Sequence, residues 1–153
     1  MLDATDRKIL ELLQADARMP NTEIAKQVDL VPSAVLERIR RLEKKGVIEG
    51  YGVRVNPKAL GQGLAAYIAV RSTGRVGAVE TAQEIAKLPQ VLEVHLVAGE
   101  DCLLVKVRSG DTDDLTRLLR ERFGKIRSIE STRTTIVLDT IKETFALPIA
   151  AQD

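Results

Sequence analysis

The sequence has few of the residues on which disulfides, metal sites and most catalytic centres depend. Its 153 residues include one cysteine, Cys102, and one histidine, His95. A single cysteine excludes an internal disulfide and a cysteine-based zinc site, and a single histidine excludes histidine-rich metal clusters and most catalytic triads. The sequence also lacks a glycine-rich phosphate loop of the G-x-x-x-x-G-K-[ST] type. We therefore expect no metal, no cofactor and no enzymatic activity.

Aromatic residues and long apolar runs are scarce as well. Four aromatic side chains give little support for binding single-stranded nucleic acid by base stacking. No stretch of about 18 apolar residues could span a membrane. The first six residues include two aspartates and lack the basic and apolar regions of a secretory signal. The expectation is a cytoplasmic protein that does not associate with membranes.

The composition changes sharply along the chain. Residues 1–45 contain no glycine, and all ten glycines lie in residues 46–153. The segment 56–63 combines one proline with two glycines and has no apolar period, which is typical of a joint between domains. We predict a helix-turn-helix domain over 1–50, a hinge strand and linker over 51–63, and a ferredoxin-like domain over 64–153.

Apolar side chains in the first 45 residues recur at spacings of three and four, which predicts three helices. The first begins after Asp3, whose carboxylate can accept the N–H groups of the opening turn. A short helix covers about 22–28. The third begins at Pro32 and ends at Gly46, after two lysines. A short helix, a tight turn and a longer helix form a helix-turn-helix unit.

Beyond the joint, the pattern predicts a strand, a helix, two strands, a helix and a strand. Their ranges are 64–71, 77–88, 91–97, 102–108, 112–123 and 128–141. This β-α-β-β-α-β order is that of a ferredoxin-like domain, in which two helices cover one face of a four-stranded sheet. Polar Tyr67, Arg71, Lys106 and Arg108 alternate with apolar neighbours. Such a mixed face suits a dimer interface between sheets, and a half-solvated sheet has the same pattern.

The positive charge of residues 1–50, called the head below, is concentrated on the third predicted helix. Residues 1–50 carry nine basic and nine acidic groups, whereas residues 38–45 carry five cations and one anion. Cations within reach of a duplex bind its phosphates and release counterions, although a basic helix is also a common solvated surface. An arginine such as Arg38 is long enough to reach a base edge. The predicted DNA-contact residues are Ser33, Ala34, Glu37, Arg38, Arg41 and Lys45.

Two sets of motifs resemble a known family. The head carries Leu2-Asp3-x-x-Asp6-x-x-Ile9-Leu10 and Val35-Leu36-Glu37-Arg38-Ile39-Arg40-Arg41-Leu42-Glu43-x-x-Gly46-Val47-Ile48-x-Gly50-Tyr51. The second half carries Val97-Ala98-Gly99-Glu100-Asp101 and Ser131-Thr132-Arg133-Thr134. From Leu2 to about Lys142 the chain resembles the leucine-responsive/AsnC (Lrp/AsnC) family of bacterial and archaeal transcription regulators.

The resemblance implies an α+β chain, with a winged helix-turn-helix joined by a hinge strand to a ferredoxin-like domain. It also implies double-stranded DNA as a partner, homodimers formed through the sheets, assembly often to octamers, and an amino-acid effector bound between dimers. Three positions depart from the family pattern, namely Pro20, Asp29 and Val31. Val31 leaves the third helix without an N-cap side chain, which costs about 1 kcal/mol. The loop Gly99-Glu100-Asp101 is one residue shorter than the family's common form.

A site for an amino-acid effector must bind two groups of opposite charge. The ammonium of the effector binds a carboxylate, and its carboxylate binds N–H, hydroxyl or guanidinium donors. Glycine lets backbone N–H groups approach a ligand closely, and two threonines on one face of a strand add hydroxyls. The same residues are also ordinary in a hairpin turn and a strand. The predicted ligand residues are Gly99, Glu100, Asp101, Thr132 and Thr134.

Three hypotheses follow. The leading one is a sequence-specific DNA-binding regulator whose assembly or DNA affinity responds to a small effector. The alternative is an architectural DNA-binding protein whose second domain only oligomerises and ignores amino acids. An enzyme is the third, because ferredoxin-like domains also host catalysis. The carboxylate pair Asp113-Asp114 does not favour it, since acids at a helix start are stabilised by the helix dipole.

Overall fold

The computed structural model describes residues 2–73 and 77–149 and divides into two compact units. The first contains the chain up to Arg54 together with the tail from Lys142 onward, and the second is Val55–Ile141. This grouping differs from the expected assignment of all of 64–153 to one domain. Within the first unit, the Gln14 side-chain amide donates to the Leu147 carbonyl at 2.9 Å and accepts from the Leu147 N–H at 2.7 Å.

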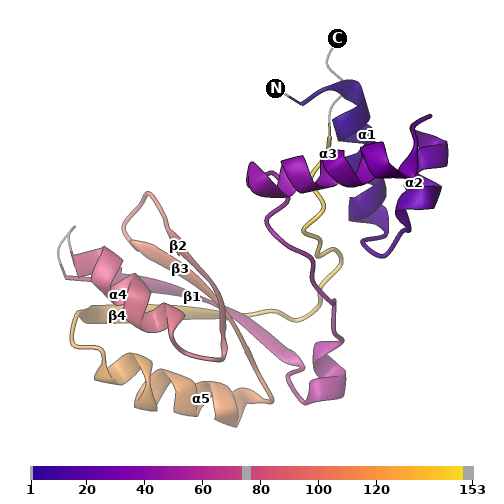
Figure 1. Cartoon of the computed structure of the whole chain (residues 1–153). Helices are drawn as coiled ribbons and strands as arrows, with labels where there is room; N and C mark the ends of the chain where they lie inside the picture. The colour runs from indigo at the N-terminus through magenta and orange to yellow at the C-terminus, as the bar shows by residue number, and fades with distance from the viewer. Residues whose placement is uncertain (1, 74–76, 150–153) are drawn as a thin grey trace. The chain divides into compact units, whose positions relative to one another are not determined.

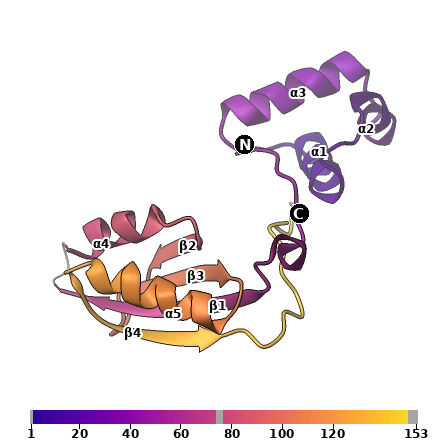
Figure 2. The ribbon, with the colours of Figure 1, turned by 90° about the horizontal axis from the view of Figure 1, so that it is seen from below.

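The first unit is built on three helices (Figures 1 and 2). They are α1 (Ala4–Ala15), α2 (Asn21–Gln27) and α3 (Pro32–Lys44). Their apolar faces meet in a core of Ile9, Ile24, Ala25, Val35 and Ile39. This confirms the helix-turn-helix order predicted from the spacing of apolar residues.

The helix ends follow the expected capping chemistry. The Asp6 N–H donates to Asp3 Oδ1 at 2.7 Å, so Asp3 is the N-cap of α1. No side chain caps α3 at Val31, and Pro32 occupies its first turn. Asp29 has φ 52° in the turn before α3, and Gly46 has φ 68° after it. Both values lie in the left-handed region that aspartate tolerates and glycine favours.

Residues 47–56 contain no strand in the structure. A hinge strand and linker over 51–63 were expected, and the resemblance implied a winged helix-turn-helix before them. In their place the chain runs irregularly to a short helix, η1 (Pro57–Leu60). An extended segment becomes a strand only when a neighbouring strand accepts and donates its backbone hydrogen bonds, and no described segment of this chain pairs with it.

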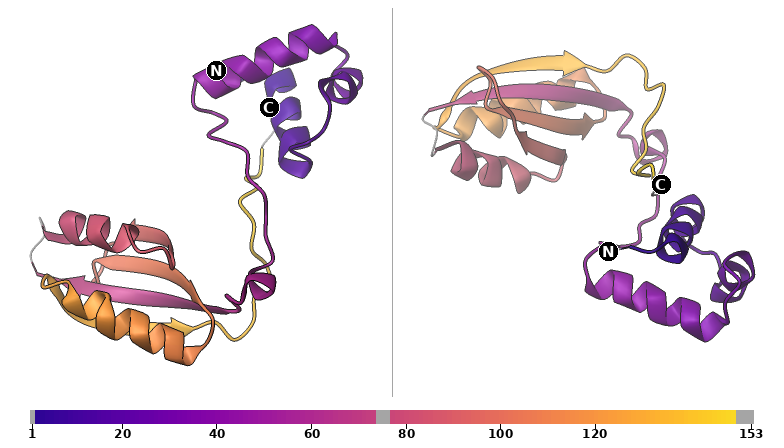
Figure 3. Two further views of the ribbon diagram at one scale, coloured as in Figure 1. Left: turned by 60° about the horizontal axis from the view of Figure 1, so that its bottom comes forward. Right: turned by 90° about the horizontal axis from the view of Figure 1, so that it is seen from above.

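The second unit is a four-stranded antiparallel sheet with the order β2-β3-β1-β4 and two helices on one face (Figures 1 and 3). This confirms the ferredoxin-like prediction. Its elements are β1 (Leu64–Ser72), α4 (Gly77–Ala86), β2 (Val91–Leu96), β3 (Leu103–Ser109), α5 (Thr112–Glu121), η2 (Phe123–Lys125) and β4 (Ile129–Ile136).

The last strand is shorter than the predicted 128–141. It ends at Ile136, which pairs with Ala66 near the start of β1, and one more bond joins the Val137 N–H to the Ala65 carbonyl at 2.9 Å. Beyond Val137, only Leu64, the first residue of β1, is left to pair with the chain. The apolar residues that follow, such as Leu138 and Ile141, are almost fully exposed.

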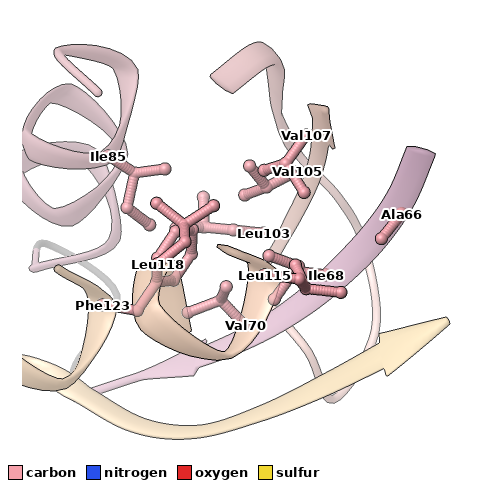
Figure 4. Packing of buried hydrophobic residues seen from close by; sticks show 10 residues of the cluster. All are labelled: Ala66, Ile68, Val70, Ile85, Leu103, Val105, Val107, Leu115, Leu118 and Phe123. Atoms are coloured by element: carbon pink, nitrogen blue, oxygen red, sulfur yellow. The ribbon is translucent and has the colours of Figure 1, made fainter. Parts of the chain in front are cut away.

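The core of the second unit lies between the sheet and its two helices (Figure 4). Alternate residues of β1 and β3 face α4 and α5, and the fully buried members include Ile68, Val70, Ile85, Leu103, Val105 and Phe123. Burying a large apolar side chain stabilises a fold by about 1.5–3 kcal/mol. The opposite face carries Tyr67, paired in register with Lys106. The period-two prediction of one apolar and one mixed face is therefore confirmed.

Candidate functional site

Two solvent-facing stripes of α3 carry its cations. Val35, Ile39 and Leu42 are buried, and the remaining positions follow spacings of three and four on either side. One stripe contains Ala34, Arg38, Arg41 and Lys45. The other contains Ser33, Glu37, Arg40 and Lys44. The DNA-contact residues predicted from the sequence come from both stripes.

Carboxylates of α1 hold the two arginines of the first stripe. Arg38 Nη1 lies 2.6 Å from Asp3 Oδ2 and 2.7 Å from Asp6 Oδ1. Arg41 Nη2 lies 2.9 Å and 3.0 Å from the two oxygens of Asp6. The Asp6 side chain is 4% exposed, whereas those of Arg38 and Arg41 are 25% and 46% exposed. The arginines therefore reach solvent from a buried anchor.

This contact shifts two pKa values. The hydrogen bond from Arg38, helped by the backbone N–H of Asp6, holds the pKa of Asp3 below its usual value. Hydrogen bonds to Asp3 and Asp6 raise the pKa of Arg38. Both groups stay charged at neutral pH, so the contact between Asp3 and Arg38 is an ion pair there.

The other cations of α3 have no such restraint. Arg40, Lys44 and Lys45 are exposed, and no described carboxylate forms an ion pair with them. The sequence prediction did not include Arg40 or Lys44. The spacing Ser33–Glu37–Arg40–Lys44, opposite the buried residues, is the signal that identifies them.

The predicted ligand loop also contains two ion pairs. It connects β2 to β3, and Gly99 has φ 145°, a conformation that L-residues rarely adopt. Asp101 Oδ2 lies 2.7 Å from Arg133 Nη2, and Glu100 Oε2 lies 3.2 Å from Arg71 Nη2. Arg133 and Glu100 are 78% and 90% exposed, so both pairs are open to solvent.

Within one chain, the structure does not place the predicted threonines beside these carboxylates. Thr132 and Thr134 pair with Val70 and Ile68, whose side chains face the helices. Arg133 pairs with Ala69 on the other face, and that face carries the contact with Asp101. Period two correctly put the threonines on one face of β4, but it could not say which face.

The single histidine and cysteine make ordinary structural contacts. His95 Nε2 lies 3.3 Å from Glu93 Oε2, and Lys106 Nζ lies 3.2 Å from the other oxygen of Glu93. Although partial burial opposes the shift, these bonds hold the pKa of Glu93 below its usual value. Cys102 Sγ lies 3.4 Å from Ser72 Oγ. In the described part of the chain, no cluster of three or more His, Cys, Asp or Glu could hold a metal.

One surface hollow occurs elsewhere in the second unit. It lies where β3 meets α5, and its lining includes Gly61, Arg108, Gly110, Asp114, Arg117 and Arg122. None of the predicted ligand residues lines it. No helix among the described residues is long and apolar enough to cross a membrane.

Comparison with known proteins matches both halves of the chain. Residues 2–49 match a family described as winged helix-turn-helix DNA-binding. Residues 65–147 match the Lrp/AsnC ligand binding domain. The two matches fall on the regions whose motifs carried the resemblance in the sequence.

Individual proteins are similar over nearly the whole length. The transcriptional regulator FL11 of Pyrococcus furiosus is 38% identical over 150 residues, covering 97% of each chain. The leucine-responsive regulatory protein of Escherichia coli is 36% identical over 152 residues, covering 97% of this chain and 92% of its own. A transcriptional regulator of Neisseria meningitidis, solved as a complex with L-methionine, has a TM-score of 0.91 at 31% identity and 97% coverage of each chain.

Proposed function

The chain belongs to the Lrp/AsnC family of DNA-binding transcription regulators, and from this we propose how its residues bind DNA and an effector. Family membership confirms the resemblance found in the sequence. It also confirms that the protein is not an enzyme, because its relatives are named as transcriptional regulators. We place its action in the cytoplasm, where the DNA of bacteria and archaea, the sources of its relatives, lies.

In this proposal α3 is the recognition helix and enters the major groove. The single observation that carries it is the exposed face of α3, with the small Ser33 and Ala34 at its start and cations along its length. Small residues let the first turn approach the base edges. Arg40, Lys44 and Lys45 bind phosphates, which fixes position without reading sequence. Arg38 reads a base edge, and the predicted contacts Glu37 and Arg41 lie beside it.

The effector is an amino acid bound at the loop 98–101. A free amino acid is a zwitterion, so it can insert between Asp101 and Arg133. The ammonium group of the amino acid would bind the Asp101 carboxylate, and its carboxylate would bind the Arg133 guanidinium. The 78% exposure of Arg133 allows that side chain to move aside. The relative crystallised with L-methionine supports this class of effector. Thr132 and Thr134 contribute hydroxyls where a second subunit brings them to the loop.

The proposed assembly is a homodimer that associates further to an octamer. The sheet face with Tyr67 and Lys106 carries no helix and alternates polar and apolar residues. A second copy of the same face could cover it. A dimer of helix-turn-helix units binds two half-sites about 34 Å apart or a multiple of that distance. The operator is then a pseudo-palindrome.

The DNA contacts are tested by measuring affinity against salt concentration. Arg40→Ala with Lys44→Ala should weaken binding to all duplexes alike and reduce the slope of log K against log salt by about two. Arg38→Ala should relax specificity at one base position. Lys8→Ala on α1 is the control, since Lys8 pairs with Glu11 outside the recognition helix. Unchanged affinity and salt slope in the Arg40/Lys44 variant would refute the assignment.

The effector is tested by thermal unfolding with each of the twenty amino acids. A ligand at 100 times its Kd stabilises the native state by about 2.7 kcal/mol, which raises Tm by a few degrees. Asp101→Asn should abolish that shift, whereas the control Glu80→Gln on α4 should keep it. No shift with any amino acid would favour the architectural alternative, in which the second unit only oligomerises.

A further inference from the structure

The acidic side chains next to the recognition helix have the wrong sign for a DNA-binding surface. Asp3 and Asp6 lie against α3, and their charges repel the phosphates that its cations attract. Asp6 is 3% exposed and receives three hydrogen bonds from arginines. Asp3 already has a structural role as the N-cap of α1, yet its second oxygen binds Arg38 at 2.6 Å.

These contacts sort the cations of α3 into two classes. Two carboxylates offset the charge of two guanidinium groups, so the part of the stripe that contains Arg38 and Arg41 is locally neutral. The contacts use one terminal nitrogen of each arginine. A guanidinium has five N–H donors in a rigid plane. Each arginine therefore keeps donors for DNA while its direction is fixed from the protein side.

A guanidinium that is held in one direction and paired with a carboxylate contributes more to reading a DNA base sequence than to general attraction to phosphates. Phosphate binding depends on net charge and tolerates many geometries. A bidentate contact to guanine depends on the direction of the guanidinium plane. A side chain that is already ordered loses less conformational entropy when it makes such a contact.

We infer that Asp3 and Asp6 are positioning residues for DNA recognition: they orient Arg38 and Arg41 and withhold their charge from phosphates, which makes the head discriminate between sequences. This inference rests on the proposed role of α3 in binding DNA. It assigns specificity to two acidic residues of α1 that do not contact DNA themselves.

Asp3→Asn in the full-length protein tests the inference. Asparagine caps a helix as well as aspartate does, so α1 keeps its N-terminus while the cluster of Asp3, Asp6, Arg38 and Arg41 gains one net positive charge. The matched control is Glu11→Gln, which makes the same charge change on the same helix at a residue paired with Lys8. Asp6→Asn is the second variant, because its amide oxygen still accepts hydrogen bonds from the arginines.

The measurement is fluorescence anisotropy with two probes, a mixed-sequence 30-bp duplex and a duplex selected from a random pool with the wild-type protein. We expect Asp3→Asn to bind the mixed duplex about five- to tenfold more tightly than Glu11→Gln at about 0.1 M salt, the effect of one added phosphate contact. Its log K should depend on log salt with a slope about one unit steeper. The ratio of affinities for the selected and mixed duplexes should fall.

Two results would overturn the inference. In the first, Asp3→Asn and Asp6→Asn change affinity, slope and ratio no more than Glu11→Gln does. In the second, they weaken binding to both duplexes equally, which is the behaviour of purely structural ion pairs. Either result leaves the proposed function standing if the wild-type protein binds the selected duplex and loses affinity in the Arg40/Lys44 variant. If the wild-type protein binds neither duplex, both the proposed function and this inference are wrong.

Discussion

Each unit of this protein sets two carboxylates against two arginines, but the two arrangements differ in burial. In the first unit the central carboxylate, Asp6, is 4% exposed and binds both arginines. In the second unit Glu100 and Asp101 bind one arginine each, and Glu100 is 90% exposed. The same chemical groups therefore form a fixed network in one place and separate surface pairs in the other.

Burial decides what such a pair can do. Exposed ion pairs contribute about 0–1 kcal/mol, because water and salt replace the partner at little cost. Removing one partner of a buried pair costs about 3–5 kcal/mol, because the charge that remains has neither water nor partner. The first arrangement is therefore suited to holding side chains in place. The second is suited to exchanging a side chain for a ligand.

The largest expected effect comes from removing both arginines from Asp6. Arg38→Met with Arg41→Met leaves a buried carboxylate without its partners, and we expect a loss of about 3–5 kcal/mol in the stability of the first unit. The matched variant, Arg71→Met with Arg133→Met, should cost less than about 2 kcal/mol, since both of its pairs are exposed. Urea unfolding followed by circular dichroism measures both.

A further substitution distinguishes the effect of the unpaired charge from general misfolding of the variant. Adding Asp6→Leu to the Arg38/Arg41 variant removes the unpaired charge and should recover part of the lost stability, because apolar residues often replace a buried ion pair without cost. Equal losses in the two arginine variants, or no recovery with leucine, would contradict the distinction between the two arrangements.

An intermediate effect is expected in acid. Because the bond from Arg38 lowers the pKa of Asp3, Asp3 contributes its stability fully above the unfolded pKa of about 3.9. That contribution is lost as the pH falls through the lower, folded pKa. The stability difference between the wild type and Asp3→Asn should thus be constant above about pH 5 and shrink below about pH 3.9. A difference independent of pH across that range would show that the charge of Asp3 is not the cause.

Apolar periodicity was sufficient to predict most of the fold. The spacing of Ile9, Val35 and Ile39 identified the core faces of the first unit, and the alternation around Tyr67 and Lys106 identified the mixed face of the sheet. These elements follow local rules, since each buries one face. Residues 47–56 and 138–141 also contain several apolar residues, but no described strand pairs with them. Pairing depends on the rest of the fold and cannot be read from the segment itself.

The sequence suggested where the candidate sites lie, but it could not predict the contacts of their side chains. Charge and spacing pointed to α3, and the family resemblance pointed to the loop after β2. Neither predicted that Asp6 would contact arginines 32 and 35 residues away. The role of Arg133 could not be predicted, because its contact with Asp101 joins residues that are 32 positions apart in the sequence. Arg40 and Lys44 are different, because the helical period alone identifies them.

The smallest effect should come from the pair most open to solvent. Arg71→Gln removes the contact with Glu100, and we expect it to cost under about 1 kcal/mol at low salt. The cost should vanish near 1 M salt, where the screening length is about 3 Å. Arg41→Gln is the comparison, since its partner Asp6 is buried and salt screens buried pairs much less. The measurement is Tm at about 0.02 M and 1 M sodium chloride for each variant and the wild type. If the Arg71→Gln difference survives high salt as well as the Arg41→Gln difference does, burial does not separate the two arrangements, and the loop pair is as fixed as the network on α3.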